Sequence, residues 1–236
     1  MSRIRTGGSR SPRELVSKTE TTPSRRRKLA SPSRKIAAVG KALCVSASDD
    51  DCYAVCLTLT YAKDHDFAPE HISRFFDRLR SKLKRQGKLL RYLWVLEKAG
   101  RLHYHLVIWL PRGLRLQHAE LDRWWPWGTS WIEACQSPHM WIKYLRKYED
   151  KALLPVGARM FGYGGLDEAG KRTVALACLP QWLKAKLPAD VWPTRIAGGW
   201  LDPSTGEIHT SPYRWTPKGF QLREQPQQDE SVTEED

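Results

Sequence analysis

Two histidines, His103 and His105, lie two residues apart in a segment whose composition predicts a β-strand, Gly100–Trp109. Because alternate residues of a strand face the same side of a sheet, both imidazoles should project from one surface, opposite Tyr104. Two neutral imidazoles on one surface can bind one metal ion. A strand with two partly exposed histidines and no ion satisfies the same pattern, so the pair needs support from other residues.

An acidic residue is expected next to this pair. The segment Arg91–Glu97 has the apolar composition of a second strand, and residues 98–101 form a short connection that contains glycine. The hairpin that this pattern predicts brings the Glu97 carboxylate close to His103. Two imidazoles, one carboxylate and open coordination positions suit a divalent ion that acts on a substrate rather than one that braces the fold.

A second group of reactive side chains follows in a predicted helix. Ser-Pro at positions 137–138 has the residue types of an N-cap and a first helical residue. At about 100° per residue, Tyr144 and Tyr148 lie roughly 40° apart, and Lys147 and Lys151 lie on the same side of the helix. Each phenol thus has a cation one turn later that can stabilise a phenolate or a phosphate. Tyrosines at the border of a buried stripe can also simply pack their rings.

The overall composition favours a polyanionic partner. The chain has 236 residues and a formal net charge of +13, which suits nucleic acid but does not by itself separate it from a membrane surface or a ribosome. No apolar run of about 18 residues and no signal peptide is readable, so we expect a soluble protein without a membrane partner. No Cys-x-x-Cys pair and no Gly-x-x-x-x-Gly-Lys-Ser/Thr loop occurs, so neither a zinc knuckle nor an ATPase is predicted.

Composition divides the chain into three regions. Residues 1–50 are rich in Ser, Arg and Lys over most of their length, which predicts a disordered basic tail. Residues 51–165 have the pattern of a folded domain, and residues 166–236 form an extension of unknown role that ends in a loose acidic tail. Unless the first region is only a solubilising leader, we expect it to attract phosphate backbones through Arg25, Arg26, Arg27 and Lys28.

Strand and helix patterns alternate in an order typical of an α+β fold. We expect a central antiparallel sheet covered by helices. The tryptophans at 124–131 are expected mainly in the core, although an exposed one could stack with an unpaired base. The predicted elements are a strand at 54–61, a helix at 69–85, the hairpin, a helix at 114–123, a strand at 129–135, the tyrosine-bearing helix, a short helix at 180–186 and a hairpin at 200–209.

Three blocks, in this order, resemble the HUH endonucleases and, among them, the rolling-circle replication initiators of small bacteriophages of the filamentous and microvirus type. The apolar strand at 56–61 resembles the first motif of that family, and Glu97 with the His-Tyr-His at 103–105 resembles its metal-binding second motif. The segment 144–151, Tyr-x-x-Lys-Tyr-x-x-Lys, resembles its catalytic motif in the two-tyrosine form. The resemblance covers about residues 53–151.

The resemblance implies a sheet-based nuclease fold of the HUH or RRM-like type and a specific chemistry. Glu97, His103 and His105 would bind Mg²⁺ or Mn²⁺, of which Mn²⁺ is the better match to two imidazoles. One tyrosine would attack a phosphodiester of single-stranded origin DNA, retain the 5′-phosphate as phosphotyrosine and free a 3′-hydroxyl primer. The implied roles are nucleophiles for Tyr144 and Tyr148 and orientation of phenol and phosphate for Lys147 and Lys151.

Arg101 is a further candidate for DNA contact, and Leu102 follows it where the phage proteins often have proline. The expected partners are single-stranded or locally melted origin DNA, a host helicase and a host DNA polymerase, in the cytoplasm of a bacterial host. With two tyrosines, the predicted enzyme both nicks and rejoins DNA. Two alternatives stay open: a related HUH relaxase or transposase, and a non-catalytic single-stranded-DNA-binding or regulatory protein.

Overall fold

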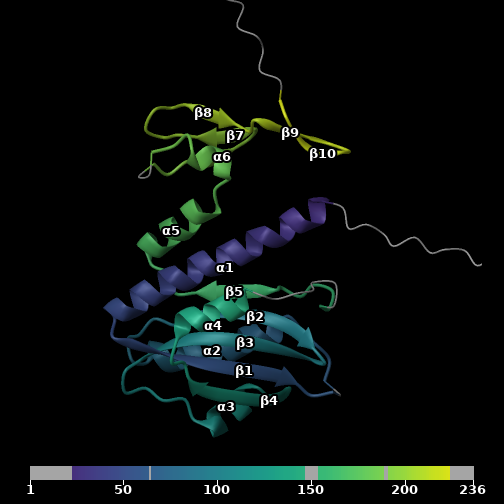
Figure 1. The fold of residues 1–236 in the computed structure, drawn as a ribbon. Helices are drawn as coiled ribbons and strands as arrows, with labels where there is room; N and C mark the ends of the chain where they lie inside the picture. Colours follow the sequence, from purple (N-terminus) through teal and green to yellow (C-terminus); the bar gives the residue numbers. More distant parts are fainter. Residues whose placement is uncertain (1–22, 64, 147–153, 189–190, 224–236) are drawn as a thin grey trace, which may run out of the picture.

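The computed structural model describes residues 23–63, 65–146, 154–188 and 191–223, with the backbone alone for residues 23–31. Its centre is a five-stranded sheet of order β4-β1-β3-β2-β5, in which every neighbouring pair is antiparallel (Figure 1). The strand that carries the two histidines, β3, is therefore the central one. The strands are β1 (Cys52–Tyr61), β2 (Arg91–Ala99), β3 (Arg101–Pro111), β4 (Gly128–Ala134) and β5 (Phe161–Gly164).

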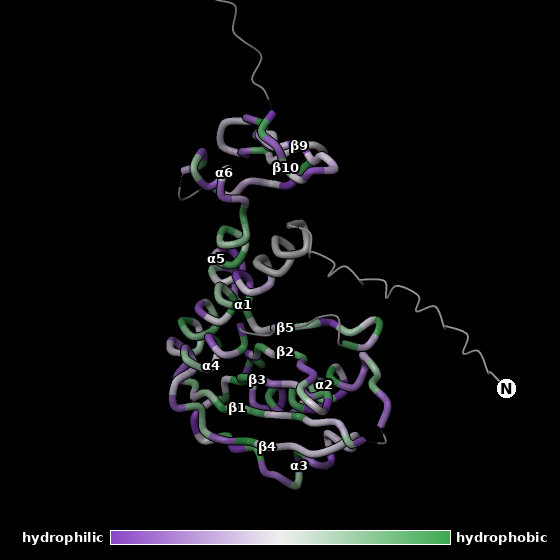
Figure 2. Tube along the Cα trace, turned by 45° about the vertical axis from the view of Figure 1, so that its right-hand side comes forward, coloured by the Kyte–Doolittle hydropathy of each residue, from purple (hydrophilic) through white to green (hydrophobic). Residues whose placement is uncertain are grey.

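Helices cover both faces of this sheet, which confirms the predicted α+β fold. On one face α2 (Glu70–Lys84) and α3 (His118–Trp124) pack over the strands, and on the other face α1 (Pro23–Asp49) and α4 (Pro138–Leu145) do so. Because side chains alternate along a strand, β3 supplies both clusters: Tyr104 and Leu106 face α2, whereas Val107 faces α1 and α4. In Figure 2 the strands β1, β2 and β3 accordingly carry long hydrophobic stretches.

The predicted helix at 69–85 is confirmed as α2. Its buried residues recur every three or four positions, as a helix with one apolar face requires, and they are Ile72, Phe75, Phe76, Leu79 and Leu83. The hairpin is also confirmed, with a tighter turn than expected, because Ala99 already pairs with Arg101. Gly100 alone makes the turn and has a φ of 72°, a conformation that favours glycine.

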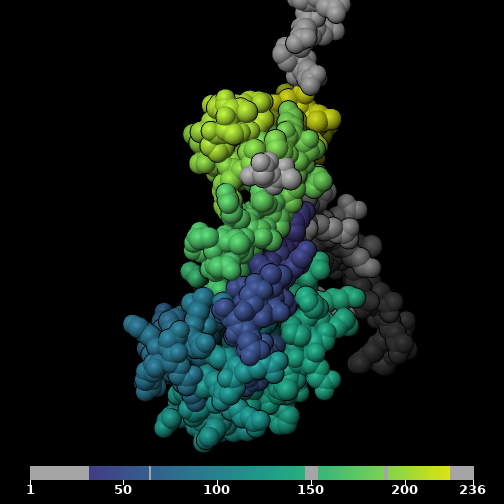
Figure 3. All heavy atoms as spheres, turned by 90° about the vertical axis from the view of Figure 1, so that its left-hand side faces the viewer, coloured from purple at the N-terminus to yellow at the C-terminus, as the bar shows by residue number. Residues whose placement is uncertain are grey.

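The predicted disordered tail is wrong for residues 23–49, because they form the long helix α1. Its second half has an apolar period that the basic composition of the segment conceals: Ile36, Val39, Leu43 and Ala47 are all buried against the sheet. Figure 3 shows α1 lying between α5 (Glu168–Cys178) and the sheet. The folded unit therefore begins well before residue 51, and residues 1–22 lie outside the described part of the chain.

Other differences lie where short-range patterns are weak. The predicted helix at 114–123 begins later, as α3, because Gln117 is extended and caps the helix by donating its backbone N–H to Glu120. Neither β5 nor α5 was predicted as an element. The first pairs with β2, and the second packs against α1. The folded unit thus extends beyond residue 165.

The last described part of the chain forms two small sheets next to a short helix. The predicted helix at 180–186 is confirmed as α6 (Gln181–Lys184), and the predicted hairpin at 200–209 is confirmed by the pairing of Trp200 with His209. The strands are β6 (Thr194–Ile196), β7 (Gly199–Leu201), β8 (Ile208–Thr210), β9 (Tyr213–Thr216) and β10 (Gly219–Leu222). The acidic segment 224–236 lies outside the described residues. In the part of the chain that is described, no helix has the length and apolar composition to cross a membrane.

Candidate active site

The register of the sheet brings the three predicted metal ligands to one face. Glu97 of β2 lies directly opposite His103 of β3, and His105 lies two residues further along the same strand. Residues that face each other across antiparallel strands project from the same side. The prediction that folding of the hairpin places Glu97 beside the histidines is therefore confirmed.

The three side chains converge on one point. The two Nε2 atoms of His103 and His105 are 3.1 Å apart, and Glu97 Oε2 lies 4.0 Å and 3.9 Å from them, respectively. One donor atom from each residue lies within 4.8 Å of the other two. Such spacings suit a cation with bonds of about 2.0–2.2 Å to nitrogen and carboxylate oxygen. The side chains are largely buried, with 13% exposure for the imidazoles and 18% for the carboxylate.

Contacts behind the imidazoles orient them. His103 Nδ1 lies 2.9 Å from the Arg101 carbonyl oxygen, and His105 Nδ1 lies 3.2 Å from Thr58 Oγ1. If each Nδ1 carries the proton and donates it to these oxygens, the lone pair of each Nε2 faces the cluster, as a metal ligand requires. Burial, aided by the neighbouring His103, lowers the pKa of His105 to about 4. His105 is therefore neutral near pH 7, and this donor set fits a divalent metal ion.

The candidate nucleophile Tyr144 lies beside this cluster. Its helix starts as predicted, because Ser137 Oγ accepts the backbone N–H of Met140 and Pro138 is the first helical residue. The Tyr144 ring is 41% exposed, and its centroid lies 5.5 Å from that of His105. Burial and the Glu97 carboxylate both raise the pKa of the Tyr144 phenol, so the hydroxyl is protonated near neutral pH.

Trp141 holds the tyrosine ring in place. The two rings are stacked, with centroids 5.2 Å apart and planes 23° from parallel. The indole N–H of Trp141 donates a 3.2 Å hydrogen bond to the carbonyl oxygen of Leu106, which anchors α4 to the central strand. Together these contacts aim the Tyr144 ring at the side of the sheet where the imidazoles lie.

The other predicted site residues are not part of this geometry. Lys147, Tyr148 and Lys151 lie outside the described residues, as do the side chains of Arg25, Arg26, Arg27 and Lys28. The structure describes α4 as ending at Leu145, so the second half of the predicted helix is untested. The Arg101 side chain is exposed at the end of the hairpin, two residues from His103, where it can reach a polymer bound over the cluster.

Two residues near the cluster have no predicted role. Thr58 lies opposite His105 on one side and opposite Trp131 on the other, so all three share one face of the sheet. Trp131 is 64% exposed, unlike the neighbouring Trp125, which is fully buried. Strand spacing of about 4.8 Å places the backbone of Trp131 roughly 10 Å from that of His105. Only the pairing of β1 with β3 and β4 reveals this row, because the three residues are far apart in sequence.

Comparison with known proteins gives one match. Residues 54–153 match the model of a protein family described as Replication-associated protein, ORF2 type. Searches among curated proteins and among solved structures gave no significant match. The matched segment contains most of β1, the strands β2, β3 and β4, the helix α4 and every residue of the cluster described above. Over residues 54–153 the chain is therefore similar to the replication-associated proteins of this family, which supports a role in the initiation of DNA replication.

Proposed function

We propose that the protein is a rolling-circle replication initiator: a metal-dependent endonuclease that nicks and rejoins one strand of origin DNA through a covalent 5′-phosphotyrosine. The observation that carries the proposal is the convergence of Tyr144 with Glu97, His103 and His105 on one face of the sheet, inside the segment that matches the replication-associated family. A nucleophile next to a candidate metal centre is the arrangement that phosphodiester transfer needs.

The chemistry divides between the ligands and the nucleophile. A divalent ion, Mg²⁺ or Mn²⁺, would supply positive charge beside a non-bridging phosphate oxygen and the departing 3′-oxygen. The phenolic oxygen of Tyr144 bonds to phosphorus as the bond from phosphorus to the 3′-oxygen breaks. The phenol loses its proton, the 3′-oxygen gains one, and the 5′-phosphate stays on the enzyme. A host polymerase can then extend the free 3′-hydroxyl, behind a host helicase that separates the strands.

A second tyrosine would allow the cycle to end. Tyr148 follows Tyr144 by four residues, and Lys147 and Lys151 follow the two phenols by three. While one tyrosine holds the old end, the other cuts the regenerated origin, and the released 3′-hydroxyl attacks the first phosphotyrosine to close the circle. The lysines orient phenol and phosphate by charge. The cleaved strand is unpaired, and the exposed ring of Trp131 beside the cluster is placed to stack with one of its bases.

Covalent capture of DNA tests this proposal. The protein is incubated with Mn²⁺ and a labelled library of randomised single-stranded oligonucleotides, and protein-bound label that survives denaturation is measured. We expect wild-type protein to form adducts and His103→Ala to lose them, while His118→Ala, which changes an exposed histidine of α3, keeps them. The double variant Tyr144→Phe/Tyr148→Phe should also lose them, with each single variant partly active.

A matched control separates loss of the nucleophile from general damage. Tyr213 is 39% exposed, close to the 41% of Tyr144, and lies on β9 away from the cluster. Tyr213→Phe should form adducts like wild type. If wild-type protein binds single-stranded DNA in this assay yet never forms an adduct, the protein is a non-catalytic DNA-binding protein and the endonuclease proposal is wrong.

A further inference from the structure

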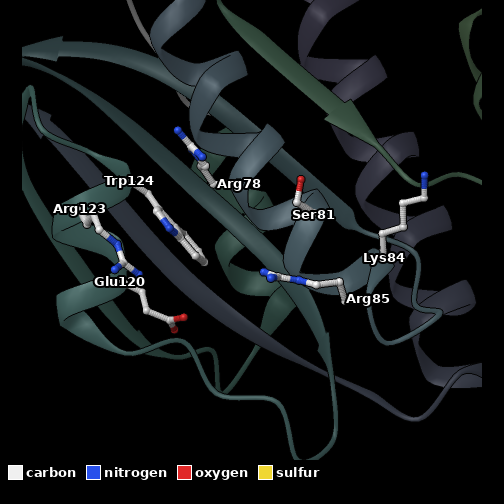
Figure 4. Close-up of a pocket in the computed structure, with 7 residues that line it drawn as sticks. All are labelled: Arg78, Ser81, Lys84, Arg85, Glu120, Arg123 and Trp124. Carbon is white, nitrogen blue, oxygen red and sulfur yellow. The ribbon is translucent and has the colours of Figure 1, made fainter.

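A basic cleft lies between α2 and α3, with a volume of about 820 Å³. Figure 4 shows its residues: the side chain of Arg85 extends from the end of α2 toward the α3 side. The α2 side carries Arg78, Lys84 and Arg85, and the α3 side carries Glu120, Arg123 and Trp124. Four cations and one carboxylate therefore line a single cavity.

The carboxylate does not neutralise these cations. Both oxygens of Glu120 accept hydrogen bonds from Lys82 Nζ, at 2.7 Å and 2.5 Å, and this contact lowers the pKa of Glu120 below its usual value. Among the described residues, Arg78, Lys84 and Arg85 form no ion pair. Their charges are thus available to a polyanion that enters the cleft.

The cations also follow a line along α2. Arg74, Arg78 and Arg85 lie at i, i+4 and i+11, which places them on one side of the helix over about 16 Å. A row of fixed, exposed guanidinium groups matches successive phosphates of a nucleic-acid strand, since each planar group can donate two parallel hydrogen bonds to phosphate oxygens.

The cleft lies across the sheet from the candidate active site. Helix α2 packs on the face to which Tyr104 and Leu106 point, whereas His103 and His105 project from the other face. A nucleic-acid segment in the cleft is therefore a different segment from the one at the cluster.

The cleft lacks an accessible aromatic face. Trp124 is half-buried, with Lys82 Nζ 5.8 Å from its ring centroid and Phe75 against its edge. Sites for single strands combine cations with exposed aromatic rings on which bases stack. Cations without such a ring instead suit the backbone of a duplex, whose bases are already stacked.

We infer that the α2–α3 cleft binds the phosphodiester backbone of double-stranded DNA that flanks the strand held at the metal cluster. The choice of DNA among polyanions rests on the proposed function. The cleft thus anchors the protein beside the origin through a contact that is independent of sequence, while the opposite face acts on the unpaired strand.

Binding of a generic duplex tests this inference without the metal cluster. Fluorescence anisotropy with a random-sequence duplex of about 20 base pairs is measured in EDTA over a range of salt concentrations. Each phosphate contact contributes about 0.9 to the slope of log affinity against log salt. Arg78→Gln/Arg85→Gln should lower that slope by about 2 and weaken binding at least roughly tenfold near 0.1 M salt. Failure of nicking cannot cause this result, because no cleavage occurs in EDTA.

The matched control removes two other exposed arginines. Arg80 pairs with Asp77 and Arg112 pairs with Asp51, so Arg80→Gln/Arg112→Gln lowers the net charge equally without touching the cleft. This control should lose no more than about twofold in affinity, since it affects only the general field. Thermal melting of each variant, followed by circular dichroism, verifies that both remain folded.

Three results would overturn the inference. The first is a duplex affinity that is unchanged in Arg78→Gln/Arg85→Gln. The second is an equal loss in the two double variants, which would mean that only net charge matters. The third is a loss for a 20-nucleotide single strand as large as the loss for the duplex, which would assign the cleft to unpaired DNA.

Discussion

At the scale of single residues, the hydroxyl of Thr58 decides how one candidate ligand is presented. Thr58 Oγ1 lies 3.2 Å from His105 Nδ1, and a partner on the far nitrogen of an imidazole fixes both its tautomer and its orientation. The same role falls to the Arg101 carbonyl oxygen behind His103. A backbone carbonyl cannot be removed by substitution, but the threonine hydroxyl can.

Thr58→Val should weaken binding of Mn²⁺ by about tenfold or more, because it removes the hydroxyl while keeping the shape of the side chain. Thr58→Ser should restore most of the affinity. Isothermal titration with Mn²⁺ measures both. Thr60→Val is the matched control: Thr60 lies on the same face, opposite His103, and forms no side-chain hydrogen bond with the described residues. Equal losses for Thr58→Val and Thr60→Val would show that the Thr58 hydroxyl has no specific role.

At the scale of elements, α1 supports the helix that carries Tyr144. The two helices approach closely at Gly40, where an added Cβ atom would lie 2.6–2.9 Å from side-chain atoms of Ile142. Arg146 Nε also donates a 3.4 Å hydrogen bond to Ser33 Oγ of α1. The position of the tyrosine over the cluster therefore depends on a glycine that is far away in the sequence.

Gly40→Leu should destabilise the fold by roughly 1–3 kcal/mol, because the new side chain overlaps Ile142 and pushes α4 away from the sheet. Chemical denaturation measures this loss. Adding Ile142→Ala should make room, so the double variant should be more stable than the sum of the two single losses predicts, by about 0.5–3 kcal/mol. Lys41→Leu changes an exposed neighbour and should cost less than about 0.5 kcal/mol. Strict additivity would mean that this contact does not set the position of α4.

At the scale of the whole molecule, the two faces of the sheet carry different surfaces. One face presents the candidate metal cluster, Tyr144 and the exposed ring of Trp131. The other presents the cleft between α2 and α3, which has cations but no free aromatic ring. This division assigns unpaired DNA to the first face and duplex DNA to the second.

Trp131→Ala should weaken binding of a 12-nucleotide single strand about 5-fold to 150-fold, since base stacking on an aromatic ring contributes roughly 1–3 kcal/mol. Trp131→Phe should recover part of the affinity. Anisotropy in EDTA measures binding, and the affinity for the generic duplex should not change. Trp215→Ala, which removes an equally exposed ring (66%) on β9, is the control and should bind like wild type. A single-strand affinity that survives Trp131→Ala would exclude this ring as a stacking platform.

The sequence by itself determined the parts of the site that depend on neighbours along the chain. The alternation at His103 and His105, the turn at Gly100 and the distance to Glu97 all lie within one hairpin, so the local pattern sufficed to predict the cluster. The start of α4 at Ser137 was equally readable, because an N-cap acts within a few residues.

Only the tertiary structure decided which distant elements meet at the site. The contact of Thr58 with His105 spans 47 residues and requires the register between β1 and β3, which no local pattern encodes. The same applies to α1, whose basic composition predicts a tail, whereas the chance to bury Ile36 and Leu43 against the sheet makes it a structural helix. Helix formation in proteins depends chiefly on such packing, and packing partners that are remote in sequence become visible only once the chain has folded.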